Sequence, residues 1–194
     1  MKLCELLKMC GEHSSVTTLS PGTVVFLEFL IIVLFIAWVG RMVWKKDRKG
    51  IRDVIGAAIA IVLFEVMIDP LIYNTGFFSW SYFFHDVTFI LTFGWILIVS
   101  FSVRMVDKVF ARLSEPKRFL LYLCLIDMFV VVIEVFLVKS GLRSYSASLA
   151  NSRYGIYVPF TPVPIGVVFV IPACFALVIS FTKYLEKIAW KVRP

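Results

Sequence analysis

Charged residues are scarce in this sequence. Only 17% of its 194 residues are Asp, Glu, Lys or Arg, whereas 60% are apolar, and the mean hydropathy is +0.92. That composition excludes a soluble globular domain and is typical of an integral membrane protein. The net charge of +7 does not indicate nucleic-acid binding, because the charges alternate with apolar runs of about twenty residues. We expect the basic residues to contact the anionic head groups of membrane lipids.

Cysteine is scarce as well. The four cysteines are Cys4, Cys10, Cys124 and Cys174. They form no CxxC pair and imply no disulfide framework. The last two fall in apolar runs, where cysteine packs as a small apolar side chain. The first two could form a metal site with His13, but no fourth ligand is apparent. We favour a short amphipathic segment over residues 1–20 instead.

Several motifs of familiar enzymes are missing. The sequence contains no nucleotide-binding loop, no clear cluster of metal ligands and no Ser-His-Asp set. We therefore predict that the protein uses no cofactor and no metal. Glu5 and Lys8 interrupt any apolar stretch near the N-terminus, so residues 1–20 do not have the pattern of a cleavable signal peptide.

Five apolar runs are long enough to cross a membrane as helices, which takes about twenty residues. They cover residues 21–44, 53–73, 87–106, 119–139 and 162–182. Ser20-Pro21 marks the start of the first run. Asp69-Pro70 should kink or end the second, because proline lacks a backbone donor and restricts the preceding residue. The predicted fold class is an all-α membrane bundle. We expect a single domain, 1–194, with an N-terminal segment 1–20, a bundle 21–182 and a basic tail 183–194.

Basic residues are unevenly distributed among the connecting segments. The loops 45–52 and 107–118 and the tail, together with the helix-end residues Arg41 and Arg104, contain most of the 20 Lys and Arg residues. The positive-inside rule then places the N-terminus outside and the C-terminus in the cytoplasm, as five spans require. We predict a multi-pass protein of the plasma membrane or an endomembrane, and the sequence leaves the oligomeric state open.

Carboxylic acids interrupt these apolar runs. Glu65 and Asp69 lie one helical turn apart, and no Lys or Arg falls within their run. An ionised carboxylate without a partner is costly in hydrocarbon, so these acids should be protonated, hydrogen-bonded or facing a polar cavity. Glu134 shares a face of the fourth span with Asp127, seven residues earlier. These three acids and Glu28 fall in the outer half of the membrane, whereas Asp127 lies deeper. This placement predicts an acidic cavity open to the non-cytoplasmic side.

Aromatic residues crowd the loop 74–86 that follows the second span. Its segment Gly76-Phe-Phe-Ser-Trp80 is echoed by Gly141-Leu-Arg-Ser-Tyr145 after the fourth span, which indicates a weak parallel repeat. His85-Asp86 could be a proton-handling pair, but we favour Asp86 as the cap of the third helix.

The paired pattern resembles small integral-membrane cyclases, namely the carotenoid (lycopene) cyclase and carotenoid hydratase families and the avermectin-type spirocyclase family. The matching residues are Glu65, Asp69, Gly76, Trp80 and Tyr82 in the first half, and Asp127, Glu134, Gly141, Tyr145 and the segment 159–164 in the second. The resemblance covers residues 64–172 and leaves out the first span. Lycopene cyclases carry a Pro-x-Glu-Glu/Asp motif, whereas the corresponding segment 162–166 has no acid. What the resemblance implies is therefore a type of reaction, the acid-started cyclisation or hydration of a lipophilic substrate.

The chemistry of the residues favours that reaction type independently. A carboxyl group removed from water stays protonated and can act as a general acid, while a carboxylate and aromatic faces stabilise a cation. We expect Glu65 to be the proton donor, Asp69 its hydrogen-bonded partner and Glu134 the opposing base or charge stabiliser. The expected substrate contacts are Trp80, Tyr82, Tyr145 and Asp127. The protein would then be an isomerase or lyase of terpenoid or polyketide secondary metabolism.

Other interpretations remain open. The same acids could bind the ion of a proton- or cation-coupled carrier, or the chain could be an accessory subunit without a site of its own. For Glu28 and Asp127 we prefer a structural role, and for Glu65 with Asp69 a functional one. Trp80 could belong to an interfacial aromatic belt. The expected partners are a lipophilic small molecule and membrane lipids, not nucleic acid.

Overall fold

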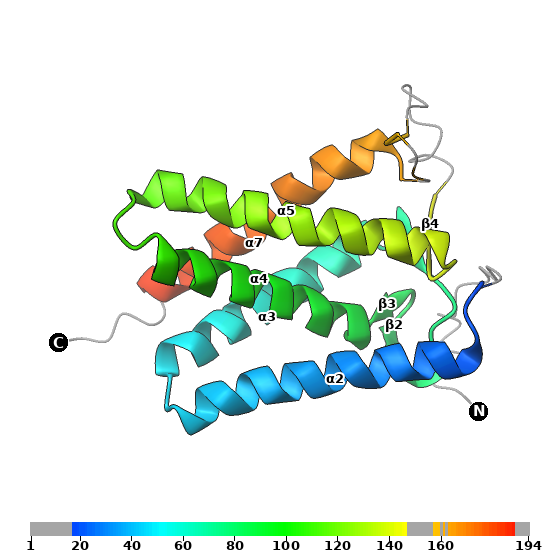
Figure 1. The fold of residues 1–194 in the computed structure, drawn as a ribbon, viewed down its shortest axis with the longest axis horizontal. Helices are drawn as coiled ribbons and strands as arrows, with labels where there is room; N and C mark the ends of the chain where they lie inside the picture. Colours follow the sequence, from blue (N-terminus) through cyan, green and yellow to red (C-terminus); the bar gives the residue numbers. More distant parts are fainter. Residues whose placement is uncertain (1–16, 147–156, 160, 162, 189–194) are drawn as a thin grey trace.

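The computed structural model describes residues 17–146, 157–159, 161 and 163–188. Five long helices form a bundle (Figure 1): α2 (Pro21–Trp44), α3 (Arg48–Ile68), α4 (Phe89–Val109), α5 (Glu115–Lys139) and α7 (Ile165–Ile188). Short strands and a 3₁₀ turn, η1 (Ser79–Ser81), lie at one end of it. The predicted all-α membrane bundle is confirmed. Cys4, Cys10 and His13 lie outside the described residues.

Four of the described helices, α2, α4, α5 and α7, are long and apolar enough to cross a membrane. Helix α3 is of similar length but carries Arg52, Asp53 and Glu65. It packs against α4 and α7 through a face that includes Ala57 and Ala60, and small residues allow helices to approach closely. The second predicted span thus differs from the other four in charge rather than in length.

Large apolar side chains cover the outward faces of the helices. They include Phe26, Ile36, Leu63, Val132 and Phe169, all exposed in the isolated chain. Exposed apolar surface of this extent marks a contact with another apolar phase. The outer surface therefore supports a membrane location.

The start of the first helix follows its sequence signal. Ser20 accepts a hydrogen bond from the backbone N–H of Thr23 at 3.2 Å, and Pro21 occupies the first helical position. Helix α3 begins at residue 48 rather than 53, because Asp47 caps it by accepting a hydrogen bond from Gly50 N–H at 2.8 Å. The basic stretch predicted as loop is therefore partly helical.

The end of α3 was predicted correctly, whereas the residue that caps the start of α4 was not. Helix α3 ends at the Asp69-Pro70 step, as expected. Helix α4 is capped by Thr88, whose hydroxyl accepts from Leu91 N–H, so the assignment of Asp86 as its cap was wrong. Asp86 instead lies directly before the short strand Val87–Thr88.

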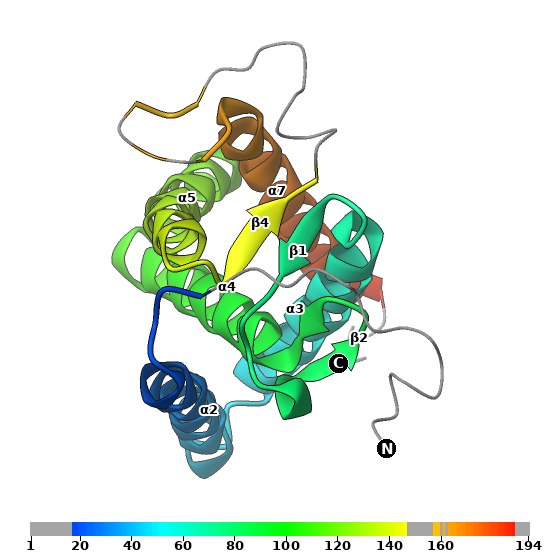
Figure 2. The same ribbon diagram turned by 90° about the vertical axis from the view of Figure 1, so that its right-hand side faces the viewer.

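Two small antiparallel sheets close one end of the bundle (Figure 2). Strand β1 (Ile72–Asn74) pairs with β4 (Arg143–Tyr145), with Asn74 opposite Arg143, and β2 (Tyr82–Phe84) pairs with β3 (Val87–Thr88). The first pairing joins the segments that follow α3 and α5, where the predicted repeat lies.

The two glycines of that repeat both adopt left-handed backbone angles, with φ of +80° at Gly76 and +73° at Gly141. Glycine tolerates this region because it lacks a Cβ. Gly76 follows its strand, however, whereas Gly141 precedes its own. The two copies therefore share residue types, but their glycines occupy different positions relative to the paired strands.

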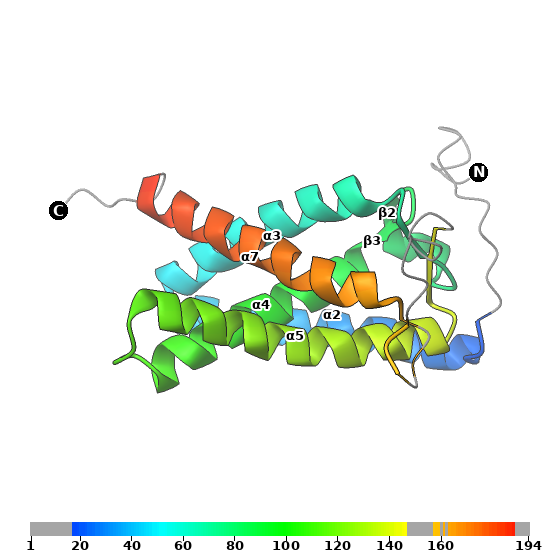
Figure 3. The same cartoon turned by 90° about the horizontal axis from the view of Figure 1, so that it is seen from above.

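The basic loops lie at the opposite end from the strands. The α2–α3 and α4–α5 connections and the C-terminal end of α7 all gather there (Figure 3). This distribution agrees with the asymmetry on which the N-outside orientation rests. The orientation itself stays a prediction.

Candidate active site

A cavity of about 120 Å³ lies between α3, α4, α5 and α7, beneath the β1–β4 pair. Most of its wall is apolar, with side chains such as Ile61, Val130, Val167, Ile171 and Phe175. The polar residues in the wall are Glu65, Asp69, Asn74, Glu134 and Arg143, joined by the indole of Trp95. The structure thus brings all three predicted catalytic acids to one cavity at the strand-bearing end.

Glu65 is buried on α3 and faces α4. Its Oε2 lies 2.5 Å from the hydroxyl oxygen of Thr92, and that hydroxyl lies 3.0 Å from the carbonyl oxygen of Thr88. Trp95 and Arg143 are also close enough to interact with the Glu65 carboxyl. The carboxyl is therefore fixed in orientation by hydrogen bonds while it borders an apolar space.

Glu134 is held by a cation that sequence reasoning missed. Arg143 Nη1 lies 2.6 Å from Glu134 Oε2, and the two side chains are only 7% and 1% exposed. Arg143 Nε donates to Asn74 Oδ1 at 2.8 Å, and its guanidinium carbon lies 5.5 Å from the centre of the Trp95 ring. Although no Lys or Arg falls within the run of Glu65, the fold brings Arg143 close to both Glu134 and Glu65.

The signal for Arg143 was present but ambiguous. It falls within the second copy of the repeat, yet it reads as an ordinary basic residue of an outer loop. Only the register of β1 and β4 places it opposite Asn74 and over the cavity. Trp95 had no distinguishing signal, because it is one aromatic residue in a long apolar run.

Tyr145 is hydrogen-bonded to the acidic member of the same ion pair. Its hydroxyl donates to Glu134 Oε1 at 2.6 Å. Burial, together with the Glu134 carboxylate, raises the pKa of Tyr145 well above its usual value, so its proton stays on the phenol. Tyr145 therefore holds Glu134 and is not itself among the residues that line the cavity.

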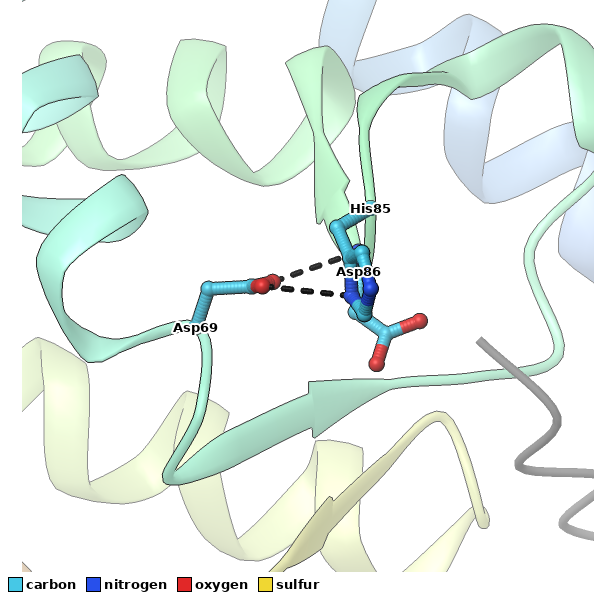
Figure 4. A group of neighbouring side chains, drawn as sticks. All are labelled: Asp69, His85 and Asp86. Atoms are coloured by element: carbon cyan, nitrogen blue, oxygen red, sulfur yellow. Dashed lines mark hydrogen bonds and ion pairs between the residues drawn. The ribbon is translucent and has the colours of Figure 1, made fainter. Parts of the chain in front are cut away.

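Asp69 turns towards the β2–β3 hairpin rather than towards Glu65 (Figure 4). Its Oδ1 accepts from the backbone N–H of Asp86 at 3.2 Å, and its Oδ2 lies 3.3 Å from Nδ1 of His85. The predicted hydrogen bond between Asp69 and Glu65 is replaced by these contacts. His85 is half-exposed and reaches back to Asp69.

The same three residues could accept a cation. Asp69, His85 and Asp86 each offer a ligand atom, and these atoms lie within 4.8 Å of one another. Both oxygens of Asp69 already have partners in the hairpin. The prediction that the protein uses no metal stays a prediction.

The other expected substrate contacts lie away from the cavity. Trp80 packs against Phe29 of α2 and Phe89 of α4, and the hydroxyl of Tyr82 donates to the carbonyl of Asn74 at 3.0 Å. Neither is among the described residues that line the cavity, and neither is Asp127. The lining of this cavity therefore gives no support to their assignment as substrate contacts, which stays a prediction.

Glu28 has a structural position. It is fully buried, and its Oε1 accepts from Phe78 N–H at 2.9 Å and from the Ser81 hydroxyl at 2.8 Å. These bonds attach α2 to the turn η1, although the two elements are far apart along the chain. The geometry therefore supports the structural interpretation of this acid.

Comparison of the chain with family models, curated proteins and solved structures finds no match. The resemblance to membrane cyclases consequently remains a prediction from a few residues.

Proposed function

We propose that this protein is an integral-membrane enzyme that protonates a lipophilic terpenoid or polyketide and thereby starts its cyclisation or hydration. Glu65 is the proton donor. The observation that carries the proposal is the position of this carboxyl group, which is hydrogen-bonded to Thr92 at the wall of a mostly apolar cavity.

Counting protons supports a neutral Glu65. The hydroxyl of Thr92 has one proton and lies within hydrogen-bond distance of two oxygens, Glu65 Oε2 and the carbonyl oxygen of Thr88. A carbonyl oxygen only accepts. An ionised Glu65 would have to share the single Thr92 proton with the Thr88 carbonyl, whereas a protonated Glu65 can donate to Thr92 while Thr92 donates to Thr88. The second arrangement gives each contact its own proton, and it is the one on which the proposed reaction depends.

The reaction balances without a cofactor. Proton transfer breaks the O–H bond of Glu65 and forms a C–H bond on an alkene carbon, leaving a carbocation and a carboxylate. In cyclisation, a second double bond closes onto the cation, and loss of a proton returns Glu65 to its acid form. In hydration, water adds to the cation, and its surplus proton returns to Glu65. Neither route oxidises or reduces the substrate.

The remaining polar residues have a supporting role in this proposal. Glu134 is paired with Arg143, which makes it a poor general base and leaves charge stabilisation as the more favourable of its two expected roles. Among the described residues, Nε and Nη1 of Arg143 have partners, so Nη2 is the nitrogen available to a substrate oxygen. The ring of Trp95 in the cavity wall offers a π face that favours a developing cation.

The cavity is too small for a whole carotenoid. Its volume of about 120 Å³ is close to that of an apolar cavity that holds one benzene ring. Leu71 and Val170 line the cavity and are also 41% and 48% exposed, so it reaches the outer surface between the end of α3 and α7. We therefore expect the reacting end of the substrate to enter there while the rest stays among the lipid chains.

The test compares lipid extracts by mass spectrometry. The native host lacking the gene is complemented with wild type, Glu65→Gln or Asp127→Asn. Glu65→Gln keeps the shape of the side chain and should reduce product at least about a hundredfold, the usual worth of a general acid. Asp127→Asn removes a helix acid outside the cavity and should retain activity. Wild-type product levels from folded Glu65→Gln would remove Glu65 from the mechanism.

A proton-coupled carrier is the second candidate. Glu65 and the Glu134–Arg143 pair line one cavity, and a carboxyl that exchanges its proton near a buried arginine is also suited to ion coupling. An isomeric or water-added product that depends on the gene supports the enzyme. Unchanged lipids, with Glu65-dependent uptake driven by a pH gradient in vesicles, support the carrier.

A further inference from the structure

A second and larger hollow lies at the opposite end of the bundle. It has a volume of about 660 Å³ and is formed by the C-terminal half of α2, the start of α3 and the C-terminal half of α4. We name it the basic groove, after Arg41, Lys45, Lys49, Arg104 and Lys108 in its wall. It is at the basic-loop end seen in Figure 1 and is separate from the cavity that contains Glu65.

The acids in the wall of the basic groove neutralise only part of its positive charge. Five basic and three acidic residues line it. Asp47 pairs with Arg104 and caps α3, and Asp107 is engaged by Arg118 outside the groove. Among the described residues, Arg41, Lys45 and Lys108 have no carboxylate partner. Excess positive charge is thus concentrated in one hollow.

Two of the cations also repel each other. Arg41 acts on Arg104 as a like charge across the groove. A bound anion would relieve this repulsion, and a guanidinium group is well suited to bind phosphate oxygens.

A buried hydrogen-bond donor points to the same kind of ligand. Trp38 lines the groove, and its indole nitrogen is buried without a hydrogen-bond partner among the described residues. An unsatisfied buried N–H is unfavourable, and indole can only donate. A ligand oxygen in the groove would satisfy it once the ring turns its N–H towards the groove.

The surroundings of the groove are those of a membrane interface. Phe101 and Met105 line it and are exposed, and the neighbouring Trp44 is 88% exposed. Tryptophan is enriched at the level of lipid head groups. The groove therefore combines a positively charged interior with an apolar rim, which matches a ligand with both a phosphate group and acyl chains.

We propose that the basic groove binds the phosphate-bearing head group of an anionic phospholipid. Arg41, Lys45 and Lys108 supply the charge, the N–H of Trp38 donates to a phosphate oxygen, and the acyl chains lie along α2 and α4. The groove shares no residue with the cavity, so lipid binding there is independent of the proposed reaction.

Native mass spectrometry of the detergent-purified protein tests this assignment. The probes are phosphatidylglycerol, phosphatidylcholine and inorganic phosphate. Wild type should retain phosphatidylglycerol in preference to phosphatidylcholine. The double variant Arg41→Gln/Lys108→Gln should bind phosphatidylglycerol about tenfold more weakly, because it loses charge-assisted phosphate contacts. Trp38→Phe keeps an aromatic ring without the donor and should also weaken retention.

A matched control separates a built site from diffuse charge. Arg112→Gln/Lys117→Gln removes one Arg and one Lys from the same end of the bundle, and both residues are exposed outside the groove. Equal losses in the two double variants would overturn the proposal, as would equal retention of both lipids by wild type. Displacement of the lipid by equimolar inorganic phosphate would overturn the assignment to a lipid. If the groove double variant fails to fold, Lys45→Gln in the exposed loop gives the same comparison.

Discussion

Arg143 and Glu134 form an ion pair whose two members lie nine residues apart in the chain and are both buried, with Nη1 2.6 Å from Oε2. The pair closes the polar end of the cavity. It also balances the charge of Glu134, a buried acid of helix α5, with a guanidinium group from outside that helix. The consequences for stability and for the role of Glu65 can be measured.

Replacing Arg143 should be severely destabilising. Arg143→Met leaves Glu134 buried without its partner, which costs about 3–5 kcal/mol. The double variant Arg143→Met/Glu134→Met removes both charges and should recover most of that loss. Denaturant unfolding in detergent measures both, with exposed Arg112→Gln as the control, expected within about 0.5 kcal/mol of wild type. A cost for Arg143→Met below about 1 kcal/mol would mean that Glu134 does not carry its charge.

The protonation of Glu65 has a direct spectroscopic signature. The infrared spectrum of wild type at neutral pH should contain the carbonyl band of a protonated carboxyl group that Glu65→Gln lacks. Thr92→Val keeps the side-chain shape but removes the hydroxyl that bonds to Glu65, so the band should shift in position. Asp127→Asn identifies any contribution of the other acid. A spectrum of Glu65→Gln identical to wild type would show that Glu65 is ionised.

A side chain at Gly76 should destabilise the protein. Its φ is +80°, and a Cβ there would lie 3.2 Å from Leu142 Cδ2 and from Thr17 Cβ. Gly76→Ala should therefore lower the free energy of unfolding by about 1–2 kcal/mol. Gly94 in α4 has no atom within 4 Å of such a Cβ, so Gly94→Ala should be neutral or stabilising by up to about 1 kcal/mol. Equal effects of the two substitutions on thermal unfolding would contradict this explanation.

Glu28 should affect stability but not chemistry. Glu28→Gln weakens the bonds to Phe78 N–H and the Ser81 hydroxyl, with an expected loss of about 1–3 kcal/mol. Product formed per folded molecule should match wild type, because Glu28 is not among the residues that line the cavity. Ser81→Ala should weaken the same attachment to a smaller extent. Loss of activity in a stably folded Glu28→Gln would place Glu28 in the mechanism.

Local sequence signals predicted the helices and several of their ends. Apolar runs indicated α2, α4, α5 and α7, and Ser20-Pro21 and Asp69-Pro70 marked a start and a stop. These features depend on neighbouring residues, through the length needed to cross a membrane and the missing N–H of proline. Local context also marked Glu65 as a candidate functional residue, because an acid in an apolar helix needs a proton, a hydrogen-bond partner or a polar cavity.

The contents of the site depended on contacts between distant residues. The β1–β4 register places Asn74 opposite Arg143, 69 residues away, and so brings a cation to Glu134. The turn η1 carries Trp80 towards α2, where it packs on Phe29 instead of lining the cavity. No periodicity encodes these outcomes.

The sequence by itself determined that this chain forms apolar helices with acids among them, because hydropathy and proline act over a few neighbouring residues. Only the tertiary structure decided which acids meet which partners. Glu65 received a hydroxyl, Glu134 a guanidinium and Asp69 a histidine. Those choices arise from how helices pack and strands pair, and the free energy of a buried charge depends on the group placed beside it.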